Sequence, residues 1–321
     1  MASKVALVRC ADYQAEALDE ALNQATGLLG GWGEFVKPGE RVLIKPNFIA
    51  PRPPEVPAQT DGRLILALAR QLNQITSRLV VGDSTAWGSA KRNAALVGLD
   101  EATLASVGLE WVNFNRPCWV TIQTPAGPRR VSLDRAVLKA DKIINVPKLK
   151  THQQLVLSGA VKNAFGAVVG KRKAWWHCRY SREAIFADMI AGVCQRIRPV
   201  LNIVDAVVVM QGQGPINGRP RKLGLLMVSA DAAAVDRISC EVVEAKAEEL
   251  EILAAAKRAK IGNTELADIE LLGEQLEAVR INDFVFAEPT LLRFGLLRVC
   301  KSIARQVRIL LRERIEKADS N

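Results

Sequence analysis

The chain has 321 residues, of which 49% are hydrophobic and 24% charged, and its formal net charge is +10. Such a chain can bury a large core, so its composition excludes a disordered or fibrous protein. No apolar stretch approaches the roughly 20 residues that span a bilayer, and the short apolar run at the start is typical of a strand rather than a signal peptide. We therefore expect a cytoplasmic protein.

Short β-branched runs alternate with stretches of helical periodicity through most of the chain. The runs are almost continuously apolar, which is typical of strands that helices cover on both faces. They are residues 4–10, 41–47, 78–84, 141–147 and 200–209. Apolar residues at three and four spacing predict helices over 13–29, 61–74 and 181–197. The pattern predicts an α/β fold with a mostly parallel sheet and helices on both of its faces.

Two further segments have local signals of their own. Residues 111–132 contain a turn at Pro125 to Pro128, which predicts a β-hairpin insertion. In the segment SADAAAVDRI, Asp231 is placed to cap a helix, and Asp236 falls about one turn later, where it can face the sheet. We expect one α/β domain over residues 1–288 and a separate helix over 289–321.

The C-terminal segment carries most of the positive charge. Residues 293–317 hold eight basic and two acidic residues, and their periodicity predicts an amphipathic helix with one basic face. Such a helix either docks on the core with a solvated cationic face, or binds an anionic membrane surface or an acidic protein partner. Nucleic acid is a weaker candidate, because aromatic residues are only 5% of the chain and no binding motif is present.

Polar or glycine-rich turns follow several of the predicted strands. Because ligands of open parallel sheets bind outside the carboxyl ends of the strands, we expect the functional site at that edge. Four lysines lie at these ends or just beyond them, namely Lys45, Lys148, Lys150 and Lys162. Together with backbone N–H groups near Ser158 and Gly159, such lysines are suited to hold a phosphate or carboxylate group.

Both histidines of the chain, His152 and His177, lie in one basic segment over residues 145–179. Cationic surroundings favour the neutral imidazole, so His152 is a candidate general base and His177 a candidate substrate contact. Asp205 interrupts an apolar strand, where a carboxylate is costly unless it is paired. It is therefore either the partner of a buried lysine or an acid of the site, and Asp83 is a second candidate acid.

Metal and cofactor ligands are sparse. The six cysteines form no CxxC pair, so the chain offers no iron–sulfur cluster ligands at the usual spacing. A divalent metal stays open but would need carboxylates beside the two histidines. The loop over residues 212–220 departs from the GxGxxG pattern and indicates a tight turn near a ligand, with Gly214 as a candidate contact. The cofactor stays unknown.

Several of these motifs, taken in order, resemble the domain of unknown function 362 family. They are KPN at 45–47, TDG at 60–62, VGDS at 81–84, PKLKTH at 147–152, SGAVKNAFG at 158–166, LNIVDAVVVMQGQGP at 201–215 and SADAAAVD at 229–236. The resemblance covers roughly residues 4–245 and implies an α/β protein, often associated with ferredoxin-type iron–sulfur modules, without a settled reaction. This chain has no cysteine-rich segment, so an electron-transfer role would need a separate ferredoxin-like partner.

The resemblance also carries the family's motif positions onto this chain. Its lysines, asparagines and histidine match Lys45, Asn47, Lys148, Lys150, His152, Lys162 and Asn163, and its acidic positions match Asp83, Asp205 and Asp236.

The leading hypothesis is an enzyme that acts on a phosphorylated or carboxylated small molecule in a lysine-rich cleft. In this hypothesis His152 transfers a proton with Asp205 or Asp83. The substrate contacts are Lys45, Asn47, Lys148, Lys150, Ser158, Lys162, Asn163, His177 and Gly214. Redox, isomerase and phosphoryl-transfer chemistry all stay open. The alternative is a non-catalytic anion-binding or adaptor protein that docks an acidic redox partner or a membrane surface through residues 293–317.

Overall fold

The computed structural model describes residues 2–53, 55–85, 89–169, 173, 176 and 183–288. His177 and the whole predicted helix over 289–321 lie outside the described residues. In the ranges that are described, no helix is long and apolar enough to cross a bilayer.

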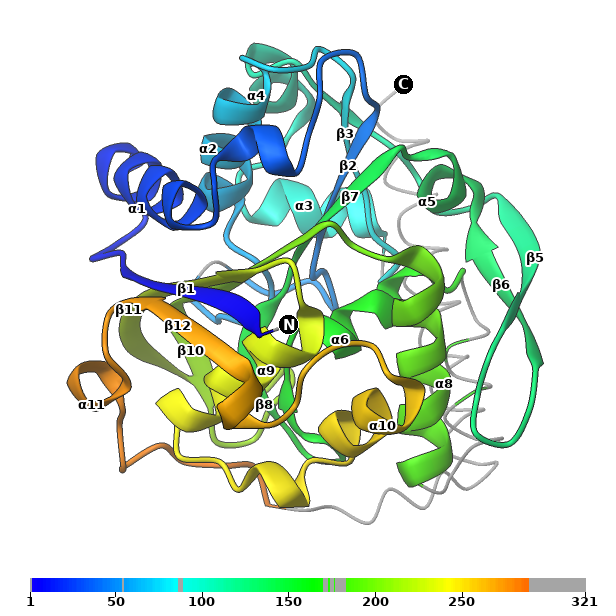
Figure 1. Ribbon diagram of the computed structural model, residues 1–321. Helices are drawn as coiled ribbons and strands as arrows, with labels where there is room; N and C mark the ends of the chain where they lie inside the picture. The colour runs from blue at the N-terminus through cyan, green and yellow to red at the C-terminus, as the bar shows by residue number, and fades with distance from the viewer. Residues whose placement is uncertain are drawn as a thin grey trace.

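A ten-stranded, mostly parallel sheet forms the centre of the molecule (Figure 1). Eight strands follow the order β12-β1-β11-β10-β7-β2-β3-β4, and only β11 runs antiparallel to its neighbours in that series. Their bounds are β1 Ser3–Arg9, β2 Val42–Pro46, β3 Leu79–Val81, β4 Leu109–Trp111, β7 Lys142–Val146, β10 Leu201–Gln211, β11 Arg219–Ser229 and β12 Ile269–Gly273. The five strands predicted from the sequence are β1, β2, β3, β7 and β10, so the α/β fold is confirmed.

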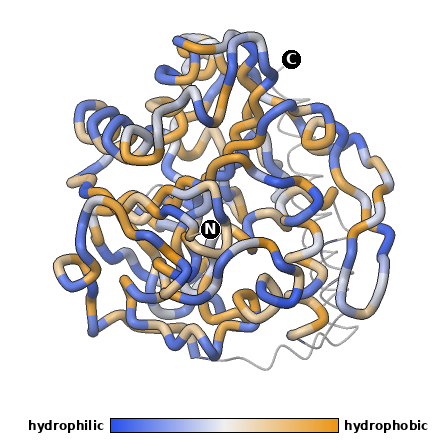
Figure 2. Tube along the Cα trace, viewed as in Figure 1, coloured by the Kyte–Doolittle hydropathy of each residue, from blue (hydrophilic) through white to orange (hydrophobic). Residues whose placement is uncertain are grey.

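Helices pack on both faces of this sheet, and each face has its own hydrophobic core. Successive strand residues alternate between the two cores, because neighbouring side chains of a strand point to opposite faces: Val5 belongs to one core and Ala6 to the other. One core contains residues of α1 (Ala15–Leu28), α2 (Gly62–Leu72), α3 (Ala90–Leu96) and α4 (Glu101–Ser106), and the other contains residues of α6 (Ala160–Asn163), α8 (Glu183–Ile197), α9 (Ala232–Val242) and α10 (Glu251–Ala259). Figure 2 shows the central strands as mainly hydrophobic, as burial on both faces requires.

The predicted hairpin insertion is present as a separate antiparallel pair, β5 (Pro117–Ile122) and β6 (Arg129–Asp134). It starts later than expected, because Leu109–Trp111 form β4 of the central sheet. The remaining short helices are α5 (Arg135–Lys139), α11 (Leu276–Val279), η1 (Trp32–Glu34), η2 (Ala164–Ala167), η3 (Ala247–Glu249) and η4 (Leu266–Asp268).

A strand that continues β7 carries the candidate lysines past the edge of the sheet. Only Pro147 separates β7 from β8 (Lys148–His152), and β9 (Val156–Ser158) folds back antiparallel to β8. Strand β10 pairs with β7 at its start and with β8 from Asp205 onward. Lys148 and Lys150 therefore lie at the carboxyl end of the parallel strands, where the sequence predicts a site.

Candidate functional site: a lysine-rich edge of the sheet

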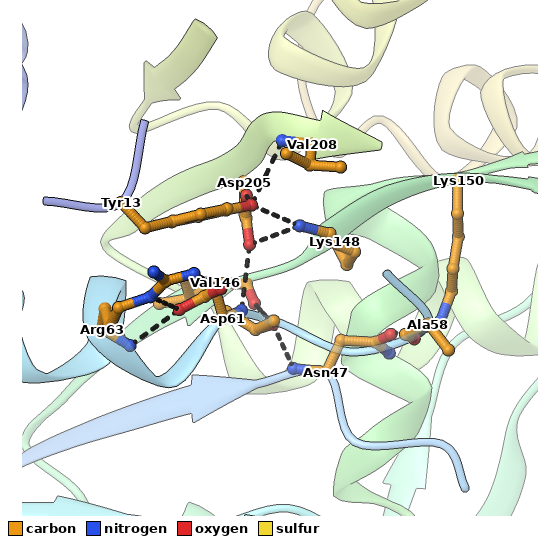
Figure 3. Close-up of polar contacts among 11 residues, drawn as sticks. Tyr13, Asn47, Ala58, Asp61, Arg63, Val146, Lys148, Lys150, Asp205 and Val208 are labelled. Atoms are coloured by element: carbon orange, nitrogen blue, oxygen red, sulfur yellow. Dashed lines mark hydrogen bonds and ion pairs between the residues drawn. The ribbon is translucent and has the colours of Figure 1, made fainter. Parts of the chain in front are cut away.

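Lys148 and Asp205 form a buried ion pair with Tyr13 (Figure 3). Lys148 Nζ lies 2.9 Å from Asp205 Oδ2 and donates to Tyr13 Oη at 2.6 Å, while Tyr13 Oη donates to Asp205 Oδ1 at 2.7 Å. The backbone N–H of Asp61 donates to Asp205 as well, at 3.0 Å. Burial, followed by the charge of Asp205, raises the pKa of Tyr13 and keeps its hydroxyl protonated. Asp205 is thus the partner of a buried lysine, which is one of the two alternatives that the sequence leaves open.

Lys45 and Asp83 form a second buried ion pair on the neighbouring strands. Lys45 Nζ, on β2, lies 2.8 Å from Asp83 Oδ1, just beyond β3, and both side chains are almost fully buried. The other oxygen of Asp83 accepts a hydrogen bond from Phe48 N at 2.8 Å. Gly166 packs against the pair so closely that a Cβ there would lie 2.2 Å from both Asp83 Oδ1 and Lys45 Nζ.

Lys150 is buried without a carboxylate partner. Its Nζ donates to Asn47 Oδ1 and to the backbone carbonyl of Ala58, each at 2.5 Å, and the residue is 1% exposed. Burial, and next the charges of Lys162 and Lys148, hold the pKa of Lys150 well below its usual value. The two oxygens that accept from Lys150 are neutral. The charge of Lys150 is therefore not balanced by an ion pair, unlike the charges of Lys45 and Lys148.

Lys162 and Lys173 extend this unpaired group. Burial lowers the pKa of Lys162 to about 8, and no residue in the described part of the chain forms a hydrogen bond or ion pair with its ammonium group. Burial lowers the pKa of Lys173 to about 7, where attraction to Asp83 partly opposes repulsion from Lys45 and Lys162. Lys173 Nζ donates to the carbonyl of Ser84. Lys173 is absent from the sequence-based candidates, although it belongs to the same basic segment as His152.

A chain of buried amides orders the space between these lysines. Asn47 Nδ2 donates to Asn163 Oδ1 at 2.9 Å, and Asn163 Nδ2 donates to Asn145 Oδ1 at 2.8 Å. Asn145 in turn donates to Asn202 at 2.9 Å. Since Asn47 also accepts from Lys150, the amide chain fixes the position of that ammonium group. The sequence singled out Asn47 and Asn163, but Asn145 and Asn202 are hidden within apolar strands.

Ser158, the last residue of β9, contributes a buried hydroxyl beside Lys150. It pairs with Lys150 in the β8–β9 ladder, so the two side chains leave the same face of the sheet. Ser158 Oγ is buried and has no hydrogen-bond partner in the described ranges.

We expected the backbone N–H groups near Gly159 to hold an anionic ligand, but they bind a carboxylate of the protein itself. Ala160 N and Val161 N donate to the two carboxylate oxygens of Asp236, at 2.5 and 3.0 Å. A Cβ at Gly159 would lie 2.1 Å from Asp236 Oδ1, so this close approach requires glycine. Burial raises the pKa of Asp236 to about 7. These two donors are therefore satisfied by the protein itself.

His152 and Gly214 lie beside this edge and have structural contacts. His152 Nδ1 accepts from Gln154 N and Leu155 N, both at 3.2 Å, so this nitrogen braces the turn between β8 and β9. A Cβ on Gly214 would lie 2.1 Å from the carbonyl oxygen of Thr151, which explains the glycine. Within the described ranges, His, Cys, Asp and Glu side chains do not gather in groups of three or more that could hold a metal ion.

These features define an α/β protein with two lysine–aspartate pairs at the carboxyl ends of its parallel strands and, near them, three lysines that lack a described carboxylate partner. The chain belongs to the DUF362 family, a domain of unknown function, whose family model matches residues 42–241. A thylakoid-associated protein of Synechocystis sp. is 33% identical over 304 residues, which are 94% of each chain. The family resemblance seen in the sequence motifs is thus confirmed.

Two solved structures have a partial likeness to this chain. A protein from Thermotoga maritima has a TM-score of 0.44 and 12% identity, over 79% of this chain and 60% of its own. The lactate racemase apoprotein from Thermoanaerobacterium thermosaccharolyticum has a TM-score of 0.44 and 11% identity, over 74% of this chain and 57% of its own. In both comparisons this chain spans less than two thirds of the other protein.

Proposed function

We propose that the protein is an enzyme that binds a small molecule through a carboxylate or phosphate group at the lysine-rich edge. The observation that carries this proposal is that Lys150, Lys162 and Lys173 have no carboxylate partner in the described residues. Charges of one sign that gather away from water are costly unless an opposite charge compensates them. An anion would accept charge-assisted hydrogen bonds from these lysines and remove that cost.

The arrangement of the group gives the anion an entry side and a deeper end. Lys162 is partly exposed, whereas Lys150 is 1% and Ser158 5% exposed. Two of the three N–H donors of Lys150 bind neutral oxygens, and Ser158 Oγ has no partner in the described ranges. We therefore place the anion past Lys162, with the remaining donor of Lys150 and the hydroxyl of Ser158 beyond it.

Acid–base chemistry is the reaction type that these lysines support best. Side chains whose pKa lies near the operating pH are the most effective general acids and bases. Lys173, with a pKa of about 7, and Lys162, with a pKa of about 8, are each present in both forms near neutral pH. They are better suited to move a proton at a bound substrate than Lys45 or Lys148, which are held in ion pairs with aspartates.

A thermal-shift screen with carboxylates and phosphorylated metabolites tests the proposal, because a ligand of the folded state raises its melting temperature. We expect Lys162→Met to weaken the binding of an active anion by about tenfold to a hundredfold, since hydrogen bonds to charged groups contribute roughly 1.5–3 kcal/mol. The matched control is Lys4→Met, which removes the same charge from an exposed position on β1. The absence of any responding anion, or equal binding by Lys162→Met, would contradict the proposal.

A second candidate function is peripheral attachment to a membrane. It is supported by the thylakoid-associated relative and by the eight basic residues within 293–317. The full chain is then expected to sediment with vesicles containing an anionic phospholipid but not with neutral vesicles, and less so at high salt.

Charge reversal in residues 293–317 distinguishes attachment through this segment from nonspecific attraction of anionic vesicles to a basic protein. Arg305→Glu with Arg308→Glu should abolish sedimentation, whereas Arg129→Glu with Arg130→Glu, at exposed positions of the hairpin, should preserve it. Equal loss in both double variants would argue against attachment through residues 293–317.

A further inference from the structure

A cavity of about 180 Å³ lies beside Tyr13 and Lys148, on the side of Arg63. One buried water needs only about 10–15 Å³ of such space, whereas pockets for drug-sized ligands measure roughly 300–1,000 Å³. The cavity therefore has room for a molecule that is larger than water and smaller than most drugs. Its apolar walls are Val56, Pro57, Val97 and Val208.

Two carboxylates line this cavity and keep free acceptor sites. Glu55 is exposed, and its carboxylate forms no hydrogen bond or ion pair with another residue of the described ranges. Asp61 Oδ1 accepts from Arg63 N and Nε, whereas Asp61 Oδ2 accepts only from Arg63 Nη2. Because each carboxylate oxygen has two lone pairs, Asp61 Oδ2 can accept one more hydrogen bond. This side of the cavity suits an ammonium group.

Two cations line the same cavity and keep free donors. Lys148 is only 2% exposed, and its Nζ donates to Tyr13 and Asp205, so the third N–H has no partner in the described part of the chain. Arg63 binds Asp61 through Nε and Nη2 and lies 4.7 Å over the Tyr13 ring (Figure 3). Its Nη1 has no described partner, and the side chain is 55% exposed. These donors suit a carboxylate.

The other polar groups beside the cavity are closed to a ligand. Tyr13 Oη donates to Asp205 and accepts from Lys148 Nζ and from Val208 N, so its hydrogen-bonding capacity is used. Gln59 lines the cavity as well, but both polar atoms of its amide are buried. A ligand in the cavity therefore meets two carboxylates and two cations.

We propose that this cavity binds a small aliphatic amino acid as its zwitterion. The ammonium group binds Glu55 and Asp61. The carboxylate binds Arg63 and Lys148. A simple carboxylate or phosphate would be repelled by the two acidic side chains, and a simple amine by the two basic ones, whereas a zwitterion complements both. The apolar walls suit a short side chain such as that of valine. This site goes beyond the proposed anion site and does not depend on it.

Calorimetry with L-valine and two analogues tests the assignment. In α-hydroxyisovalerate a hydroxyl replaces the ammonium group, and isobutylamine lacks the carboxylate. We expect the wild-type protein to bind valine at least about tenfold more tightly than either analogue, because sites built to hydrogen-bond a group discriminate strongly against its loss. Equal binding of valine and one of the analogues would overturn the proposal, and so would the absence of valine binding.

Glu55→Gln removes one of the charges that bind the ammonium group. We expect it to weaken valine binding by about tenfold and to leave the binding of α-hydroxyisovalerate unchanged or stronger. The matched control is Glu248→Gln, at an exposed position on η3 that does not line the cavity. Both positions are exposed, so the melting temperature should stay the same. Valine binding that survives in Glu55→Gln would overturn the proposal.

Two further variants separate this site from the proposed anion site. Arg63→Gln should weaken valine binding by about tenfold, whereas Lys162→Met should leave it unchanged. The reverse result would place the carboxylate of valine at the lysine-rich edge and overturn this proposal. An anion screen without a responding ligand would contradict the anion site alone, because Lys162 takes no part in valine binding.

Discussion

The lysines at the carboxyl edge of the sheet fall into two groups. Lys45 and Lys148 each form a buried ion pair with an aspartate, whereas Lys150, Lys162 and Lys173 have no carboxylate partner among the described residues. The pairs connect chain segments: Lys148 joins β8 to β10 and to the residue Tyr13 that follows β1. We propose that one residue type at one edge serves two purposes: the paired lysines stabilise the fold, and the others bind a ligand.

Breaking a lysine–aspartate pair is expected to have the largest effect. Asp205→Ala leaves Lys148 buried without a counter-charge and removes the acceptors of Tyr13 and of Asp61 N. We expect the free energy of unfolding to fall by about 3–5 kcal/mol, the usual loss when one partner of a buried pair is removed. Urea denaturation measures the loss.

The double variant Lys148→Met with Asp205→Leu is the control for this prediction. It removes both charges, so we expect it to recover most of the stability that Asp205→Ala loses. A loss below about 1 kcal/mol in Asp205→Ala would show that the pair does not stabilise the fold.

The pH dependence of anion binding tests whether the unpaired lysines bind the ligand. An anion favours the protonated form, so it raises the pKa of Lys173 from about 7 and of Lys162 from about 8, and protons are taken up on binding. Affinity for a carboxylate that stays ionised should therefore fall as pH rises from about 6 to 9, by up to tenfold per unit for each lysine. Calorimetry in buffers of different ionisation enthalpy measures both effects, and a flat profile would refute this role.

In the free protein, the contribution of Lys173 to stability should rise with pH, whereas the affinity for an anion falls. Its folded-state pKa of about 7 lies below the usual lysine pKa of 10.5, so between these values the unfolded chain binds more protons than the folded one. The contribution of Lys173 to stability therefore rises with pH across this window and is least favourable below it. Comparing wild type with Lys173→Met in denaturation at several pH values isolates this contribution.

The smallest effect is expected when an unpaired lysine is removed. Lys162→Met deletes a charge that is partly buried and has no partner in the described part of the chain, so the free protein should gain about 0.5–1 kcal/mol in unfolding free energy. Lys4→Met, at an exposed position, should change it by less than about 0.5 kcal/mol. If Lys162→Met destabilised the protein as much as Asp205→Ala, the division of the lysines into two groups would be wrong.

Features that depend on near neighbours in the chain could be predicted from the sequence. Apolar runs and helical periodicity located the five strands and the helices α1, α2 and α8 within a few residues, because strand and helix geometry repeat locally. Asp231 caps α9 as predicted, with its side chain accepting from Ala233 N and Ala234 N. The position of the lysines at strand ends followed from the same patterns, and so did the edge at which they gather.

The tertiary structure alone decided which of these groups are paired. Lys45 meets Asp83 across 38 positions of the chain, Lys148 meets Asp205 across 57, and Tyr13 meets Asp205 across 192. Asp236 occupies the backbone donors near Gly159, and Gln59 is left without a described partner. Hydrogen bonds and ion pairs act over a few ångströms, so they depend on how crossovers bring distant segments of the chain together. A local sequence pattern does not indicate which distant residues come within that range.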